Sequence, residues 1–148
     1  ADMARCTVYF SHYLLEALAQ VGEMAAFFDR LAFWFDLSAK GFKTVLESPE
    51  PSRSDCHAWG AHPIYHYFTS IFGAKPAAPA AAKLRIAPQP GPLTSLKGAF
   101  PHVNGQVAFD LQVTDAHLSG TICLPELVTA TLVWQGTERE LVPGLNRI

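Results

Sequence analysis

The spacing of apolar residues changes near the middle of this chain of 148 residues. Between Phe10 and Val21, apolar side chains recur every three or four residues, which defines one face of a helix. Between Gln106 and Val113 they alternate with polar ones, which is typical of a strand with one buried face. Residues 75–82 separate the two patterns and are rich in Pro and Ala, and proline interrupts both helices and sheet ladders. The chain is therefore predicted to be α + β, in two successive segments.

The first segment is expected to contain three helices. The second of them, from Met24 to about Lys40, is apolar nearly all round, which predicts burial from both sides and a section of a larger helical assembly. Pro63 falls inside the third helix and predicts a kink or a late start. The expected helices cover residues 10–21, from 24 to about 40, and from about 55 to about 72.

The second segment is expected to form a small antiparallel β-sandwich. Asn104-Gly105 predicts a hairpin that joins a strand at 99–103 to the strand that follows. Trp134 alternates with Leu132 and should point inward. The remaining expected strands are 84–87, 117–124, 129–134 and 139–142. The predicted domains are a helical part at residues 1–74, a linker at 75–82 and a sandwich at 83–148.

Charge and composition exclude several classes of partner. The 11 basic and 13 acidic residues give a net charge of -2, which supplies no basic patch for nucleic acid or an anionic membrane surface. No apolar run reaches the length of about 20 residues that a membrane span needs. Cys6, Cys56 and Cys123 show neither metal-ligand spacing nor a disulfide framework, so we expect free thiols.

Two residues of the first segment are candidates for carbohydrate chemistry. Glu47 lies in a loop between Gly41 and Pro49, where either a catalytic carboxylate or a solvated glutamate can occur. Trp59 follows a polar loop, and its ring could stack on a sugar or pack in the core. Both alternatives stay open at this point.

The histidines of the first segment do not predict a metal centre. His62 and His66 form an i, i+4 pair that can bind zinc on a helix, but the sequence shows no third ligand beside them. His57 and His62 are five residues apart and do not share a helical face. Asp55 fits a helix cap better than a ligand. We therefore predict no metal and no cofactor.

Two motifs in the same region resemble a known family. Thr44 to Glu47 matches Thr-x-x-Glu, and Ser54 to Trp59 matches Ser-x-Cys-His-Ala-Trp, both typical of bacterial α-L-rhamnosidases. The helices before them and the Ile86–Pro88 and Leu124-Pro125 strands after them are also similar, so the resemblance covers nearly the whole chain. Two departures are Leu46, where the family usually has Trp, and Ala80-Ala81, where Gly-Phe is common.

The resemblance implies a fold and a reaction. The family has an α/α toroid of six helical hairpins followed by a small β-sandwich, and it removes terminal L-rhamnose with inversion. Glu47 matches the position of the general base, and His57 and Trp59 match positions that line the sugar pocket. The general acid of the family lies upstream of this region, so this chain alone is expected to be inactive.

The expected partners follow from that interpretation. They are a rhamnose-containing carbohydrate, the remainder of the parent catalytic domain and a second copy that covers exposed helical faces. Two alternatives remain: a non-catalytic carbohydrate-binding or interaction module, and a hydrolase remnant whose pocket has decayed.

Overall fold

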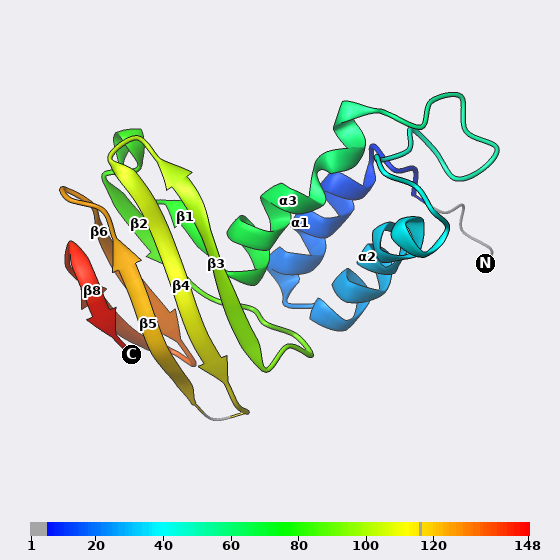
Figure 1. The fold of residues 1–148 in the computed structure, drawn as a ribbon. Helices are drawn as coiled ribbons and strands as arrows, with labels where there is room; N and C mark the ends of the chain where they lie inside the picture. The colour runs from blue at the N-terminus through cyan, green and yellow to red at the C-terminus, as the bar shows by residue number, and fades with distance from the viewer. Residues whose placement is uncertain (1–5, 116) are drawn as a thin grey trace. The chain divides into compact units, whose positions relative to one another are not determined.

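The computed structural model describes residues 6–115 and 117–148. They belong to two compact units, Ala1–Tyr67 and Phe68–Ile148. Helices dominate the first unit and strands the second (Figure 1), which confirms the predicted α + β class. The second unit begins before the boundary at residue 74 that the sequence predicts.

The first helix, α1 (Ser11–Val21), forms where the apolar spacing predicts it. Its side chains at Ser11, Leu15 and Ala19 are buried, which is one residue per turn on a single face. Gly22 ends the helix in the left-handed conformation with φ 79°, and the Glu23 amide donates to the Leu18 carbonyl at 2.9 Å. This arrangement satisfies backbone groups that a helix end otherwise leaves unpaired.

The second helix, α2 (Met24–Ala39), is covered on one face only within the described residues. Phe27, Leu31 and Leu37 are buried, whereas Phe35 is 55% exposed. Burial from both sides is predicted for a larger helical assembly, and in this chain the face of Phe35 is open while Phe27 is fully buried. Among the described residues, none of the helices combines the length and the hydrophobicity needed to cross a bilayer.

The third predicted helix begins late, as Pro63 indicates. The segment before it forms a loop and a short 3₁₀ turn, η1 (Ala58–Ala61), and α3 (Pro63–His66) starts at the proline. Proline suits the first position of a helix because its missing N–H would have no partner there. A π-type turn, η2 (Tyr67–Ile71), follows.

The second unit is a sandwich of two four-stranded sheets (Figure 1). Their strand orders are β1-β2-β6-β7 and β3-β4-β5-β8. Alternate side chains of β4 are buried, including Val107, Phe109 and Leu111, and Leu84 and Ile86 of β2 are buried in the other sheet. The strands are β1 (Ala74–Pro76), β2 (Lys83–Ile86), β3 (Ser95–His102), β4 (Gly105–Val113), β5 (Leu118–Leu124), β6 (Thr129–Trp134), β7 (Thr137–Leu141) and β8 (Gly144–Arg147).

One strand pair departs from the predicted antiparallel arrangement. Strands β2 and β6 run parallel, with Lys83 opposite Thr129 and Ile86 opposite Leu132. Parallel neighbours need a long crossover connection, and here β3, β4 and β5 of the other sheet lie between them in the sequence. The antiparallel description is therefore wrong for this pair, while every other pair in the described strands is antiparallel.

The Pro/Ala-rich segment folds as part of the second unit. Strand β1 pairs antiparallel with β2, and Pro79–Ala81 forms a 3₁₀ turn, η3, between them. Proline can occupy a strand at the edge of a sheet, which is where β1 lies. The predicted hairpin is confirmed and joins β3 to β4. Its turn is at Val103-Asn104, because His102 pairs with Gly105.

Gly120 permits the close pairing of β4 and β5, and its substitution gives a test of the sandwich. Its φ is 123°, and a Cβ there would overlap the Asp110 carbonyl oxygen and approach Leu111 Cα to 3.0 Å. Gly120→Ala should lower the free energy of unfolding by about 1–3 kcal/mol through overpacking, in addition to backbone strain of about 1–2 kcal/mol. Urea denaturation followed by circular dichroism measures the loss.

Gly136→Ala is the matched control for this prediction. Gly136 also has positive φ, 79°, but a Cβ there meets nothing within 4 Å. It should show the backbone strain without the overlap. Equal losses in the two variants would contradict the assigned role of Gly120.

Candidate functional site

Two loop segments pair beside the helices of the first unit. The His57 amide donates to the Val45 carbonyl and the Glu47 amide donates to the Ser54 carbonyl, each at 2.9 Å. The Thr44 hydroxyl donates to the Asp55 carbonyl. These bonds hold residues 44–47 against residues 54–57, so the two sequence motifs become neighbours in space.

The backbone of Gly60 joins this loop pair to α2. The Trp34 indole N–H donates to the Gly60 carbonyl at 2.7 Å. A Cβ at Gly60 would lie 2.8 Å from the Leu46 carbonyl oxygen, so the loop can approach this closely only because residue 60 has no side chain. Trp34 and Gly60 therefore set where the two loop segments lie.

The Glu47 carboxylate sits in a cationic and aromatic environment. Arg53 pairs with both oxygens, through Nη2 to Oε1 and through Nε to Oε2 at 3.2 Å. His57 Nδ1 is 4.0 Å from Oε2. The hydrogen bond from Arg53 holds the pKa of Glu47 below its usual value, and the charge of Arg53 and the neighbouring His57 act in the same direction. Glu47 is therefore ionised at neutral pH, and its side chain is only 10% exposed.

His57 and Trp59 form an aromatic pair next to this carboxylate. Their ring centroids are 4.0 Å apart with the planes tilted by 47°. Tyr9 also packs edge-on against Trp59, with ring centroids 5.5 Å apart, yet the tryptophan remains 42% exposed. Glu47, His57 and Trp59, which the sequence singles out separately, thus lie together, and an aromatic ring remains open to solvent beside an ionised carboxylate.

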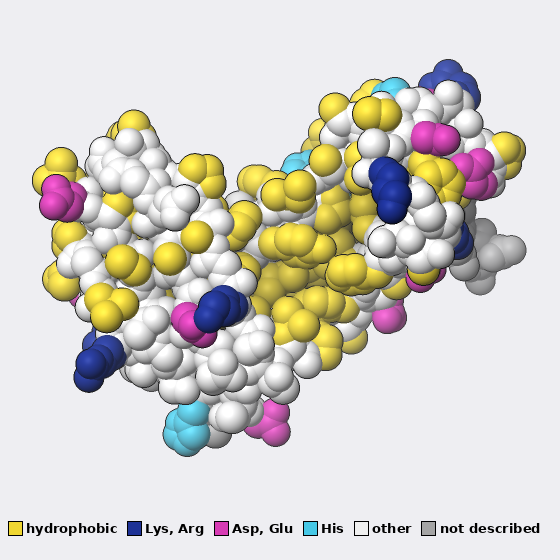
Figure 2. Space-filling model, in the orientation of Figure 1, with side chains coloured by type: hydrophobic (Ala, Val, Ile, Leu, Met, Phe, Trp, Pro, Cys, Tyr) yellow, Lys and Arg dark blue, Asp and Glu magenta, His cyan; other side chains and the backbone are white. Residues whose placement is uncertain are grey.

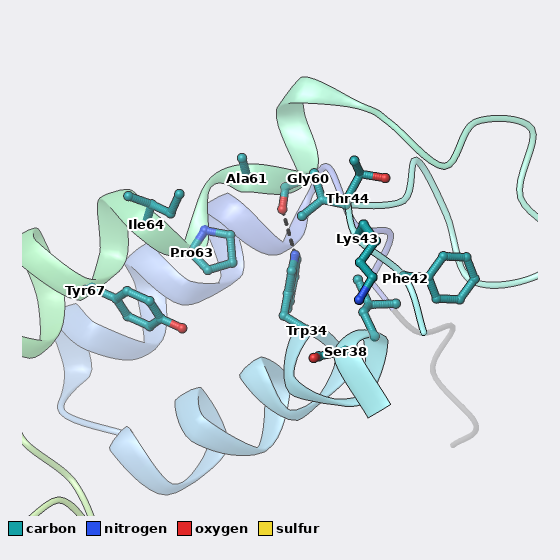
Figure 3. A pocket seen from close by; sticks show the side chains of 12 residues that line it. Trp34, Ser38, Phe42, Lys43, Thr44, Gly60, Ala61, Pro63, Ile64 and Tyr67 are labelled. Atoms are coloured by element: carbon teal, nitrogen blue, oxygen red, sulfur yellow. Dashed lines mark hydrogen bonds between the residues drawn. The ribbon is translucent and has the colours of Figure 1, made fainter. Parts of the chain in front are cut away.

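A cavity of about 460 Å³ lies in the same unit but is lined by other residues. Trp34, Lys43 and Thr44 contribute to its wall, and Figure 3 shows the Tyr67 hydroxyl turned toward Trp34. Burial raises the pKa of Tyr67, so its hydroxyl stays protonated at neutral pH. Glu47 does not line this cavity, so the cavity and the carboxylate are separate features.

Three histidines gather near the start of α1. His12 joins the His62/His66 pair, and one ring nitrogen of each lies within 4.8 Å of those of the other two. His12 Nδ1 is 3.2 Å from His66 Nε2, and His62 Nε2 is 3.0 Å from the Val8 carbonyl oxygen. Burial lowers the pKa of His62, which favours the neutral ring.

Sequence reasoning missed two members of these clusters. Arg53 is six residues from Glu47, and a basic residue in the same Pro-bounded loop was the available signal for that pair. His12 is 54 residues from His66 in the sequence, and no local spacing links them. Only the packing of α1 beside α3 brings the third histidine to the pair.

Comparison with known proteins identifies the second unit. Residues 73–147, just over half of the chain, match the model of the bacterial alpha-L-rhamnosidase C-terminal domain. No curated protein sequence matches the chain.

Solved structures of rhamnosidases resemble the chain over most of its length. The GH78 family rhamnosidase of Bacillus sp. GL1 is 27% identical over 86% of this chain, with a TM-score of 0.75. The fold alone is shared with the Streptomyces avermitilis α-L-rhamnosidase complexed with L-rhamnose, at 22% identity, 77% coverage and a TM-score of 0.63. The same holds for the Aspergillus terreus α-L-rhamnosidase, at 19% identity, 93% coverage and a TM-score of 0.76.

The chain corresponds to 15%, 14% and 18% of the lengths of these three proteins, in the same order. The family resemblance that the Thr-x-x-Glu and Cys-His-Ala-Trp motifs suggest is confirmed by the family match and by these structures. The chain belongs to the bacterial α-L-rhamnosidase C-terminal domain family.

Proposed function

We propose that this chain is the C-terminal part of an inverting glycoside hydrolase that removes terminal α-L-rhamnose from glycosides or polysaccharides. In this proposal the helices of the first unit end a six-hairpin catalytic toroid, and the sandwich follows it. The observation that carries the proposal is the cluster of Glu47, His57 and Trp59 in a chain of the rhamnosidase family.

Glu47 has the properties that the general base of such an enzyme needs. An inverting hydrolase activates a water with one carboxylate while a carboxylic acid on the opposite side of the sugar protonates the leaving oxygen. The lowered pKa of Glu47 keeps it ionised and able to accept a proton from water. Arg53 occupies one site on each oxygen, and each carboxylate oxygen has a second lone pair free for a water.

His57 and Trp59 supply the walls for a sugar beside this base. The exposed face of Trp59 suits the apolar C–H face of a deoxy sugar, and His57 offers ring nitrogens for hydroxyl groups. The general acid would come from the remainder of the catalytic domain. An inverting hydrolase needs both carboxyl groups, which lie about 6.5–9.5 Å apart. The base alone therefore does not turn over substrate.

The sandwich gives less support to a carbohydrate-binding module. Sugar-binding surfaces use exposed aromatic rings, and Trp134 is half-buried on β6. Among the described residues of the second unit, the exposed large apolar side chains are all aliphatic: Leu93, Val103, Leu127, Val142 and Leu145.

The role of Glu47 is tested in the parent enzyme. A general base contributes about 10²–10⁴-fold to the rate, so Glu47→Gln should lower kcat on an aryl rhamnoside by about that factor while the fold stays intact. Glu50→Gln is the control: Glu50 shares the loop, but it accepts the Ser52 amide at 3.0 Å and stands outside the motif. Normal turnover in Glu47→Gln together with a loss in Glu50→Gln would refute the assignment.

The ion pair of Glu47 with Arg53 makes a second prediction. Arg53→Met removes the largest cause of the lowered pKa, so the pKa of Glu47 should rise toward its ordinary value. The carboxyl resonance of Glu47, followed by ¹³C NMR during a pH titration, measures the shift. Lys43→Met removes another exposed cation of the same loop and should leave the titration unchanged.

The pair also predicts a pH dependence of stability. Because the folded state lowers the pKa, the carboxylate contributes stability above its ordinary pKa, and this contribution is lost as pH falls through the folded-state value. The Arg53→Met variant should lose less stability than the wild type over that acid range. Parallel losses would contradict the pairing.

The helical unit is expected to associate with a second copy when the chain is isolated. Hydrophobic side chains gather over the helices in the view of Figure 2. Among the described residues of the first unit, Phe10, Tyr13, Phe35, Ile64 and Tyr65 are large hydrophobic side chains that are exposed. Exposed apolar surface on helices is normally covered by a partner, which in the parent would be the remainder of the toroid.

Analytical ultracentrifugation of the isolated chain tests this association. The wild type should form dimers or larger species as concentration rises, and Phe35→Lys should shift the equilibrium toward monomer. Val103→Lys changes an exposed apolar residue of the other unit and should have no such effect. A wild-type chain that stays monomeric at high concentration would contradict the prediction.

A further inference from the structure

The histidine cluster joins the beginning and the end of the first unit. His12 lies in the first turn of α1, whereas His62 directly precedes α3 and His66 is its last residue, and Figure 1 shows the two helices side by side. His66 is fully buried, and His12 and His62 are half-buried. The cluster is distinct from the group of Glu47, His57 and Trp59.

The hydrogen bond of His62 determines which of its nitrogens can bind a ligand. A carbonyl oxygen only accepts, so at 3.0 Å from the Val8 carbonyl His62 Nε2 must carry the proton. In the neutral ring Nδ1 then carries a lone pair, and Nδ1 is buried with no hydrogen-bond partner. A buried lone pair without a donor is costly unless something fills it.

His66 is oriented in a related way. Its Nδ1 lies 3.8 Å from Glu16 Oε1, so a proton on Nδ1 faces a carboxylate and Nε2 is left to face His12. A histidine that binds a metal usually donates its other N–H to a carboxylate or a backbone carbonyl. His66 and His62 show these two arrangements respectively.

The separation of the nitrogens is close to that of a metal site. Zinc binds imidazole nitrogen at about 2.0–2.1 Å, which places two tetrahedral ligands about 3.4 Å apart. His12 Nδ1 and His66 Nε2 are 3.2 Å apart. The wider separations in the cluster, up to 4.8 Å, can close by side-chain rotation of the half-buried rings.

We propose that His12, His62 and His66 bind a divalent first-row transition metal ion, such as Zn²⁺, that fastens α1 to the segment 62–66. The proton in the contact between His12 and His66 moves to Nε2 of His12, so that all three rings present a lone pair. Three protein nitrogens leave a fourth coordination position for water. The guanidinium of Arg30 donates hydrogen bonds to the Ser11 hydroxyl at 2.7 Å and to the Cys6 carbonyl at 3.2 Å.

The test uses the full chain, freed of metal and titrated with Zn²⁺ and with Co²⁺. We expect one ion per chain, a Co²⁺ absorption spectrum of nitrogen and oxygen ligands without a thiolate band, and a higher Tm with Zn²⁺. In NMR spectra of the wild-type rings, Zn²⁺ should shift His12, His62 and His66 and leave His57, His102 and His117 in place. Shifts confined to the latter three, or no binding, would overturn the proposal.

Variants separate the cluster from other metal ligands. His12→Gln and His66→Gln should abolish the one-to-one binding, and Glu16→Gln should weaken it by about 10–100-fold, as outer partners of metal ligands do. His117→Gln and Cys56→Ser are the controls and should bind as the wild type does. Unchanged affinity in a folded His12→Gln variant would contradict the site, and the wild-type NMR result decides the question if that variant does not fold.

Discussion

The hydrogen bond from the Trp34 indole to the Gly60 carbonyl, 2.7 Å long, is the contact on which the site geometry depends. It anchors the backbone between the Cys-His-Ala-Trp motif and α3 onto α2. Because Gly60 has no side chain, the Leu46 carbonyl can approach the same point, and the loop that carries Glu47 packs beside the segment that carries His57. Any larger residue at position 60 would separate these two segments. A carboxylate and an aromatic pair that lie in different parts of the sequence therefore share one place because of a single close backbone approach.

The position of Leu46 in the structure bears on whether the sugar pocket has decayed. The family usually has a tryptophan at that position, and its absence raises the alternative of a decayed pocket. Leu46 is 1% exposed, so its side chain packs in the interior of the first unit rather than beside the Glu47 carboxylate. An aromatic ring there would add to the core of the unit. The aromatic surface next to Glu47 comes instead from His57 and Trp59, and Tyr9 packs against Trp59. The substitution thus bears on packing more directly than on sugar contact.

Local patterns in the sequence predicted those features that local physics determines. The helical spacing before Gly22, the late helix start at Pro63 and the alternation in β4 each depend on neighbours within a few residues, and each is present. The features that the sequence did not predict depend on residues that are far apart in the chain. The parallel pairing of β2 with β6 requires the intervening strands to enter the other sheet. The alternation of apolar residues within β2 does not indicate this pairing. His12 reaches His66 only through helix packing.

The electrostatics of Glu47 place a requirement on any active parent enzyme. Arg53 holds both carboxylate oxygens and is 84% exposed, so the pair is a solvated contact on one side of a carboxylate that is itself 10% exposed. Water screens such a pair, and an arginine this exposed can release one oxygen at small cost. A lower pKa keeps the base ionised but weakens its affinity for a proton. In the proposed role of Glu47 as base, the rate would depend on how far the remaining catalytic domain excludes water around the ion pair, because desolvation raises a carboxylate pKa whereas the Arg53 contact lowers it. The elements outside this chain would then supply, besides the acid, the burial that tunes the base.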